Sequence, residues 1–475
     1  MTSHKAISAL IYEKDFQGAR DGALSHLQRS KVDGQAWILL GQALRGMYRG
    51  DTAIRCFHRA AILNPAAQLD EEIQKCQHIA NGNVDSEVER FLQVPQKRVS
   101  AILIVRNEIR TMRKCLAALT GAVDEMIVVD TGSTDGTDTV ADEMGARLHR
   151  FVWNDDFAAA RNFALSLVQT DWVLSVDADE ILHDEDIDNI RTIAGLYDDI
   201  PGLFTMKVLM LNTFGSSASV SEETRMFPIN RGLSWVRPIH EQIAATNVKE
   251  EITSVTTKIR FLHDGYNPDV VNVREKYARN ARILEKHVQQ KPKNYMSHKF
   301  LAREYLMLGK SDAARVHLKA ARDLCAGYIP PLSNIDLMLI GTAEQVGEIQ
   351  LAEELALQMT QDYPDLVDGW YLYGFYQLKK STVLQKAKQY LSQAVEMNLN
   401  GKQSANSAVG VAKARLHLAD VERLSGNWIE ARRLYKLVLH ENPDFTEVKN
   451  ILSSMDKQIQ QMADELKQER HEPRH

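Results

Sequence analysis

The stretch D-W-V-L-S-V-D-A-D-E at residues 171–180 decides how the rest of this 475-residue sequence is interpreted. Residues 172–176 form a short apolar run typical of a buried β-strand, and three acidic residues follow it, Asp177, Asp179 and Glu180. A strand that carries paired carboxylates to its C-terminal end is suited to hold a divalent cation against phosphate groups. Asp-x-Asp also occurs in plain surface turns, so the surrounding sequence has to distinguish the two interpretations.

Strands and helices alternate upstream of this stretch. Residues 99–105, 126–129 and 148–153 have the apolar character of strands, and residues 109–119, 137–144 and 157–165 have that of helices. This alternation predicts an α/β domain with a parallel sheet, whose ligands bind at the carboxyl ends of the strands. Asp130 and the Asp177/Asp179 pair both follow strands, so we expect them on the same edge of one sheet.

Several motifs stand in order between about residues 100 and 266. They are Asn107-Glu108, V-V-D-T-G-S-T-D-G-T at 128–137, D-D-F-A-A-A-R-N at 155–162, D-A-D-E at 177–180, Trp235, I-H-E at 239–241 and H-D-G-Y at 263–266. Together they resemble the family 2 glycosyltransferases, which have the GT-A fold of nucleotide-diphospho-sugar transferases. The resemblance covers a little over a third of the chain.

The resemblance implies a nucleotide-sugar donor, a UDP-sugar, and a set of residues that contact it. Carried over position by position, these are Asn107, Glu108, Asp130, Gly132, Ser133, Asp156, Arg161, Asn162, Asp177 and Arg225. It also implies a divalent ion, Mn²⁺ or Mg²⁺, between the donor phosphates, with Asp179 as the direct ligand and Asp177, His263 and His240 as further candidates. A structural role is the alternative for lone histidines, for Asp155 as a helix cap and for Asp135-Gly136 as a turn.

Inversion at the anomeric carbon, which the resemblance also implies, requires a base on the acceptor side. Glu241 is the candidate for this catalytic role, together with Asp179 on the donor side. The acidic pair that often supplies the base is missing at its usual place, so Glu222 and Glu223 stay open as alternatives. Arg225 and Arg231 flank this region and are candidates for contacts to phosphate or acceptor.

Helical repeats flank the α/β region. One unit matches the tetratricopeptide (TPR) pattern at all anchors but one, with Leu44 in place of an aromatic residue: Trp37, Leu40, Gly41, Leu44, Ala53, Phe57, Ala60 and Pro65. Looser units follow residue 301, after a long amphipathic helix at 271–290. We therefore predict TPR-like repeats at 1–95, a GT-A catalytic domain at 96–268, a TPR-like array at 269–455 and a charged, frayed tail at 456–475.

A TPR array either supports a catalytic domain or presents a concave surface to a peptide or protein. The combination resembles bacterial enzymes that glycosylate peptides, including cysteine residues of bacteriocins, and enzymes that modify surface glycans or flagellar proteins. The acceptor is accordingly a peptide, a protein or a glycan, and transfer in lipopolysaccharide or surface-glycan synthesis is the alternative. A TPR scaffold with an inactive GT-A domain is a third hypothesis, which the presence of Glu108, Asp130, Arg161, Asp177 and Asp179 disfavours.

Composition restricts the partners and the compartment. A net charge of −6 argues against nucleic acid as the partner. The sequence contains no apolar run near the ~18 residues of a membrane span and no signal-peptide pattern. Four scattered cysteines without a C-x-x-C pair read as reduced thiols and predict a cytoplasmic protein. A homodimer contact through Trp428 and the last repeat is left open.

Overall fold

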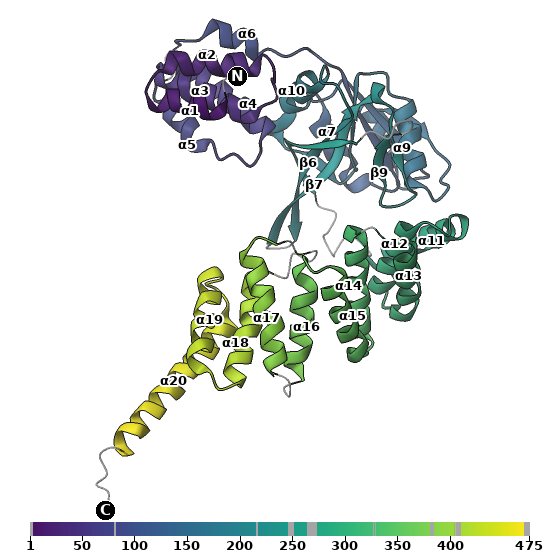
Figure 1. Ribbon diagram of the computed structural model, residues 1–475. Helices are drawn as coiled ribbons and strands as arrows, with labels where there is room; N and C mark the ends of the chain where they lie inside the picture. The colour runs from purple at the N-terminus through teal and green to yellow at the C-terminus, as the bar shows by residue number, and fades with distance from the viewer. Residues whose placement is uncertain are drawn as a thin grey trace, which may run out of the picture. The chain divides into compact units, whose positions relative to one another are not determined.

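The computed structural model describes residues 3–79, 82–214, 217–245, 251–263, 273–325, 327, 329–380, 384–402, 404 and 410–469. The chain divides into two compact units, Met1–Val273 and Arg274–His475 (Figure 1). The first unit contains a helical N-terminal segment and an α/β domain, and the second is helical in its described residues. The α/β domain flanked by TPR-like helices that the sequence predicts is confirmed. The predicted limit at residue 268 lies outside the described residues.

The N-terminal segment consists of the helices α1 (His4–Tyr12), α2 (Phe16–Leu27), α3 (Gly34–Gly46), α4 (Gly50–Leu63), α5 (Asp70–Gln77) and α6 (Ser86–Leu92). Helices α1 to α4 each pack against the next in sequence, and α6 packs against α4. Helices α3 and α4 form the unit that matches the TPR pattern, with Trp37 and Phe57 fully buried. Gly41 is required where they approach most closely, because a Cβ atom there would lie 2.7 Å from the Phe57 ring.

An eight-stranded sheet in the order β3-β2-β1-β4-β7-β6-β10-β5 forms the centre of the α/β domain. Its first half consists of β1 (Val99–Val105), β2 (Glu125–Asp130), β3 (Arg147–Arg150) and β4 (Trp172–Ser175), which are all parallel. These are the strands that the alternating sequence pattern predicts. The third ends at Arg150, three residues earlier than predicted.

The second half of the sheet is mixed, so the predicted parallel sheet is right only for the first half. Its strands are β5 (Glu180–Leu182), β6 (Phe204–Phe214), β7 (Ser217–Pro228) and β10 (Thr253–His263). Strand β7 is antiparallel to both β4 and β6, because β6 and β7 form one hairpin. Strand β10 is parallel to β6 and antiparallel to β5. A separate ribbon pairs β8 (Leu233–Val236) with β9 (Gln242–Ala245).

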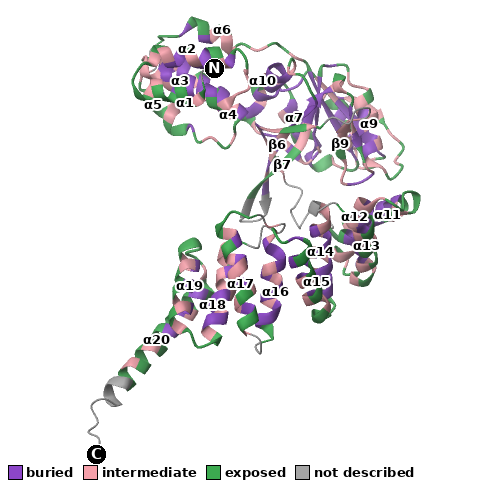
Figure 2. Ribbon diagram, in the orientation of Figure 1, coloured by how far each residue is buried: buried purple, intermediate pink, exposed green. Residues whose placement is uncertain are grey.

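Helices cover both faces of the sheet, because residues that point to either face of β1 are buried. Ala101, Leu103 and Val105 belong to one core with α7 (Ile109–Leu119), α8 (Thr137–Glu143) and α10 (Ile187–Tyr197), and that core continues into the N-terminal helices. Ile102 faces the opposite side, in a core with α9 (Phe157–Ser166) and Trp235 of β8. Figure 2 shows the buried residues concentrated in the sheet and on the facing sides of the helices. Short 3₁₀ turns occur at Asp184–Asp186 and Ile229–Arg231.

The second unit is an array of helices, each packed against the next in sequence. They are α11 (Val273–Gln290), α12 (Tyr295–Met307), α13 (Ser311–Leu324), α14 (Ile329–Gln345), α15 (Ile349–Asp362), α16 (Val367–Lys379), α17 (Leu384–Leu399), α18 (Val411–Leu424), α19 (Trp428–Glu441) and α20 (Thr446–Glu469). Gly374 of α16 repeats the role of Gly41, because a Cβ atom there would lie 2.8 Å from the Leu391 side chain. The predicted frayed tail is helical to Glu469, and residues 470–475 lie outside the described part.

The four cysteines, Cys56, Cys76, Cys115 and Cys325, are free and buried. Among the described residues, no helix combines the length and the apolar character that crossing a membrane requires.

Candidate active site

The parallel half of the sheet brings the predicted acidic residues to one edge. Glu108 follows β1, Asp130 ends β2, and Asp177 and Asp179 follow β4. These three strands are adjacent and parallel, with Val105 opposite Asp130 in the register. The predicted convergence at the carboxyl ends of the strands is therefore observed, and the side chains around these residues define what this edge can bind.

Asp130 shapes the turn that follows β2. Its Oδ1 accepts hydrogen bonds from the backbone N–H groups of Gly132, at 3.0 Å, and Ser133, at 2.8 Å, and from the Ser133 hydroxyl at 2.8 Å. Asp130 is only 4% exposed. Gly132 has a φ of 109°, a conformation that favours glycine. The buried carboxylate thus holds the D-T-G-S turn in one conformation beside the end of β1.

The loop after β1 is bonded to this turn. Asn107 has a φ of 58°, its Oδ1 accepts a hydrogen bond from the N–H of Thr134 at 2.8 Å, and its own N–H donates to the Ser133 hydroxyl at 3.0 Å. The next residue, Glu108, lies close to Asp179. Burial and then the charge of Asp179 raise the pKa of Glu108 to about 7.

Two arginines donate hydrogen bonds to Asp177. Arg161 of α9, only 6% exposed, donates from Nη2 to Oδ1 of Asp177 at 2.8 Å, and Arg225 of β7 donates from Nη2 to Oδ2 at 2.8 Å. Burial opposes ionisation, but the charges of Arg225 and Arg161 hold the pKa of Asp177 far below its usual range. Arg161 also donates to the Ser175 hydroxyl and, from Nε, to Oε1 of Glu241 at 2.8 Å. Both oxygens of Asp177 are therefore engaged by guanidinium groups.

Asp179 has a different environment. Its Oδ2 lies 3.4 Å from Nε2 of His263, at the end of β10, and the two side chains are 28% and 19% exposed. Nδ1 of His263 is hydrogen-bonded to Oδ1 of Asn212 on β6 at 2.8 Å. An amide oxygen can only accept, so Nδ1 carries a proton. Burial opposes the charged form of His263, but the hydrogen bond and the charge of Asp179 raise the pKa of the imidazole above its usual value, so Nε2 also carries a proton and faces Asp179 as a donor.

Glu180 completes the group beneath these residues. It is 2% exposed, its Oε2 accepts the N–H of Asp177 at 2.9 Å, and its Oε1 contacts Arg225. Burial raises the pKa of Glu180, and the charge of Asp177 adds to the shift against the pull of Arg225.

Other predicted site residues have mainly structural contacts. Asn162 bonds the backbone of Trp235 twice, at 2.8 and 2.9 Å, and Asp156 caps α9 through the N–H of Ala159. Arg231 donates to backbone carbonyl groups at Gly202 and Asp198, and Asp135 stabilises its own turn, as its structural alternative predicts. Glu222 pairs with Lys207 on the β6–β7 hairpin, 3.1 Å away. His240 has a φ of 49°, and Asp264–Tyr266 lie outside the described residues.

Sequence reasoning assigned no role to three residues of this site, Ser175, Glu180 and Asn212. Glu180 was visible within D-A-D-E, and Asn212 interrupts an otherwise largely apolar strand, which is a usable signal for a functional polar group. No comparable signal identifies Ser175.

Residues 100–194 match the family model described as Glycosyl transferase family 2. This part of the chain is a family 2 glycosyltransferase domain. The matched region ends before β6, so it does not include the strands that supply Arg225, Asn212 and His263.

Curated relatives match this chain over less than half of its length. A TPR repeat-containing protein of Synechococcus elongatus is 34% identical over 211 residues, which cover 43% of this chain and 51% of the relative. The SPbeta prophage-derived glycosyltransferase SunS of Bacillus subtilis is 26% identical over 221 residues, covering 46% of this chain and 51% of the relative. The chain thus spans about half the length of these relatives. The crystal structure of S. aureus TarS 1-349 is 13% identical, with 55% of this chain and 91% of that chain covered and a TM-score of 0.34.

Proposed function

We propose that this chain is an inverting, metal-dependent glycosyltransferase that moves a sugar from a nucleotide-sugar donor to a peptide or protein acceptor. The observation that carries the proposal is that the two carboxylates of the Asp-x-Asp pair have different partners. Two guanidinium groups fix Asp177, whereas Asp179 is paired with an imidazole, a group that can release its proton and become a metal ligand. A surface turn without a function would not require this arrangement.

The nucleoside part of the donor is assigned to the edge formed by β1 and β2. Glu108 and Asp130 supply carboxylate oxygens, which accept hydrogen bonds from ring N–H and ribose hydroxyl groups. Gly132 and Ser133 donate their N–H groups to Asp130, and Asn107 donates its N–H to the Ser133 hydroxyl, so the carboxylate has a fixed orientation. The pKa of Glu108 is about 7, so a bound ligand can shift this carboxyl group toward either its charged or its neutral form.

The chemistry of Asp179 and His263 fits a divalent cation. Two ligand atoms bound about 2.1 Å from one ion at right angles lie about 3.0 Å apart, and the Oδ2–Nε2 separation is 3.4 Å. Asn212 orients the imidazole as outer partners of metal-bound histidines usually do. Bound there, Mn²⁺ or Mg²⁺ would neutralise charge that develops on the leaving nucleoside diphosphate. Asp177 has a positioning role beside the metal site. His240 remains a further candidate for a metal ligand.

Glu241 is the proposed base on the acceptor side. Arg161 bonds both Glu241 and Asp177, which keeps the Glu241 carboxylate next to the donor edge, and the side chain is 16% exposed. A carboxylate at this place can take the proton of an attacking acceptor group as the new bond forms. If this role is correct, Glu241→Gln slows transfer and leaves donor binding nearly unchanged.

The second unit offers a face suited to an acceptor chain. Tyr371 and Phe375 of α16 cluster with His417 of α18, at ring-centroid distances of 5.6 and 4.7 Å from the histidine. The exposed Lys379 and Lys413 place their ammonium groups 4.4 and 5.7 Å from the Phe375 and Tyr371 ring centroids. Tyr371 is only 3% exposed, so the accessible part consists of the two lysines with the half-buried Phe375 and His417. We propose that this basic surface recruits an acceptor segment with acidic side chains. Lys379→Glu with Lys413→Glu is then expected to weaken acceptor capture without changing donor binding.

A thermal-shift panel of nucleoside diphosphates and their sugars, with and without Mn²⁺, tests the donor assignment. A ligand at ~100 times its dissociation constant stabilises the folded chain by about 2.7 kcal/mol. We expect one nucleotide class to give a metal-dependent shift that Asp179→Asn abolishes. If no donor or nucleoside diphosphate shifts the wild-type chain, the glycosyltransferase proposal fails and the scaffold hypothesis replaces it.

A further inference from the structure

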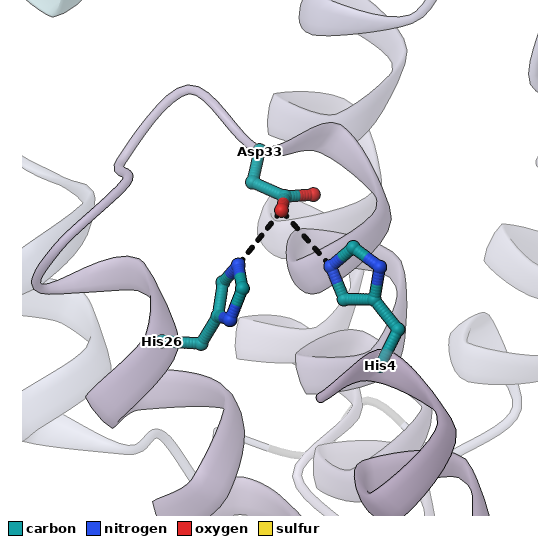
Figure 3. Close-up of side chains that lie close together, drawn as sticks. All are labelled: His4, His26 and Asp33. Atoms are coloured by element: carbon teal, nitrogen blue, oxygen red, sulfur yellow. Dashed lines mark hydrogen bonds and ion pairs between the residues drawn. The ribbon is translucent and has the colours of Figure 1, made fainter. Parts of the chain in front are cut away.

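A cluster in the N-terminal helices, remote in sequence from the transferase motifs, has the composition of a transition-metal site. His4, His26 and Asp33 offer one ligand atom each, and within the described part of the chain these atoms all lie within 4.8 Å of one another. Nε2 of His4 is 2.9 Å and Nε2 of His26 is 2.8 Å from the same oxygen, Oδ2 of Asp33. Figure 3 shows both rings directed at this carboxylate.

The three residues come from three different helices. His4 is the first residue of α1, His26 lies in the last turn of α2, and Asp33 is the N-cap of α3. The Asp33 carboxylate is oriented by the helix it caps, because Oδ1 accepts the N–H of Ala36 at 3.1 Å and Oδ2 is thereby turned toward the imidazoles. The fixed carboxylate and two convergent imidazoles, whose centroids are 4.9 Å apart, form a preorganised three-ligand set.

From this geometry we propose that His4, His26 and Asp33 bind a divalent transition-metal ion of the Zn²⁺ class, which fastens α1 to the α2–α3 connection. Two imidazole nitrogens and one carboxylate oxygen suit Zn²⁺ and disfavour Mg²⁺ or Ca²⁺, which prefer oxygen ligands alone.

The distances allow an ion with little rearrangement. Ligand atoms about 2.1 Å from a tetrahedral ion lie about 3.4 Å apart. The two N–O separations of 2.9 and 2.8 Å must therefore grow by about half an ångström each. The side chains of His4, His26 and Asp33 are 40%, 24% and 21% exposed, so an ion can reach them from solvent and a water molecule can complete the coordination.

The same contacts would also arise if both imidazoles simply donated hydrogen bonds to Asp33. Conservative variants separate the two cases. His26→Gln keeps an N–H donor and removes a strong ligand, and Asp33→Asn keeps the acceptor that caps α3 and removes the charge. His78→Gln is a matched control, because His78 is an exposed histidine at the end of α5 in the same segment.

The test uses the full chain without a polyhistidine tag, stripped with a chelator and equilibrated with Zn²⁺. Metal content after gel filtration is measured by mass spectrometry, and affinity by competition with a chromogenic chelator. Each variant is also made together with Asp179→Asn, so that Zn²⁺ at the sheet edge is counted separately.

We expect wild type and His78→Gln to retain one more equivalent of Zn²⁺ than His26→Gln and Asp33→Asn. Loss of a direct ligand should weaken affinity by at least ~100-fold, the upper end of what outer partners contribute. Co²⁺ should give visible absorption that needs His26, and Zn²⁺ should slow amide exchange in α1 of wild type and of His78→Gln but not of His26→Gln or Asp33→Asn. Equal metal content in wild type and His26→Gln, with both folded by circular dichroism, would overturn the proposal and leave a hydrogen-bonded helix cap.

Discussion

Replacing the two aspartates of the Asp-x-Asp pair by asparagine, one at a time, should have opposite effects on stability and function. Asp177 accepts a charge-assisted hydrogen bond from Arg161 and another from Arg225, each 2.8 Å long. Such bonds contribute about 1.5–3 kcal/mol each. The amide of Asp177→Asn can keep one acceptor and turns an NH₂ group toward the other guanidinium. We therefore expect Asp177→Asn to lower the free energy of unfolding by about 2–4 kcal/mol.

Asp179 is in a different position, since its contact with His263 is 3.4 Å long and both side chains are partly exposed. Pairs of this kind contribute about 0–1 kcal/mol, so Asp179→Asn should unfold close to wild type. Its effect should fall on transfer, which we expect to drop by at least ~100-fold, the scale of losing one group that stabilises charge in the transition state.

Thermal unfolding followed by circular dichroism measures the first effect, and the rate of sugar transfer from the donor class found in the thermal-shift panel, with Mn²⁺ present, measures the second. At roughly 2–4 °C per kcal/mol for a domain of this size, Asp177→Asn should lose about 4–16 °C and Asp179→Asn less than about 4 °C. Asp142→Asn, on an exposed position of α8, is the control that should change neither quantity. Equal destabilisation by the Asp177 and Asp179 variants would refute the division of roles derived from the arginine contacts.

Three further predictions use other parts of the chain. Asn212 accepts a hydrogen bond from Nδ1 of His263 at 2.8 Å, so Asn212→Ala should weaken metal-dependent nucleotide binding by about 10–100-fold, and His263→Ala should weaken it further. The measurement is the Mn²⁺ concentration that gives half-maximal nucleotide binding, and an unchanged value would remove Asn212 from the site. Burial and a neighbouring carboxylate raise the pKa of Glu108 from 4.5 to about 7, so wild type should lose stability relative to Glu108→Gln as the pH rises through this range. Denaturant unfolding at several pH values measures the difference in stability between the two proteins, and a difference that does not change with pH would contradict this prediction. In the second unit, Gly374→Ala should destabilise the fold by about 1–3 kcal/mol, because the added Cβ would lie 2.8 Å from the Leu391 side chain. Gly341 is also helical but has nothing within 4 Å of an added Cβ, so Gly341→Ala should stabilise the fold by up to about 1 kcal/mol. If both variants shift the unfolding temperature in the same direction, packing at Gly374 is looser than the structure indicates.

The donor edge of this site could be predicted from the sequence because its logic is local. Each of Glu108, Asp130 and Asp177 directly follows or ends an apolar run, and parallel strands deliver their carboxyl ends to one edge. The TPR-like units were predictable for a similar reason. The positions of Trp37 and Gly41 repeat a spacing that two packed helices require.

The partners of these carboxylates could not be predicted in the same way. Arg225 lies 48 positions after Asp177 in the chain, on a strand that runs antiparallel to β4. Nothing in the alternating pattern indicated that the sheet continues with the β6–β7 hairpin. Asn212 and His263 are likewise 51 positions apart and meet because β10 pairs with β6 in parallel. Long-range pairing of strands, which hydrophobic periodicity does not encode, therefore decides which carboxylate is neutralised.

The charges around Asp177 explain why the pair is divided in this way. Three carboxylates, Asp177, Glu180 and Glu241, share two guanidinium groups, those of Arg161 and Arg225. The raised pKa of Glu180 supplies the balance, since one proton retained there leaves the buried group without net charge.

These two arginines pair with Asp177, whereas the ion pair of Asp179 is with His263. His263 stands beside it, turned by Asn212 so that Nε2 faces the carboxylate. An imidazole can give up its proton whereas a guanidinium cannot, so we expect a divalent cation to replace that proton between His263 and Asp179 when a diphosphate binds. An arginine in place of His263 would satisfy Asp179 permanently, and such a substitution is expected to preserve the fold while removing the Mn²⁺ requirement for nucleotide binding together with transfer.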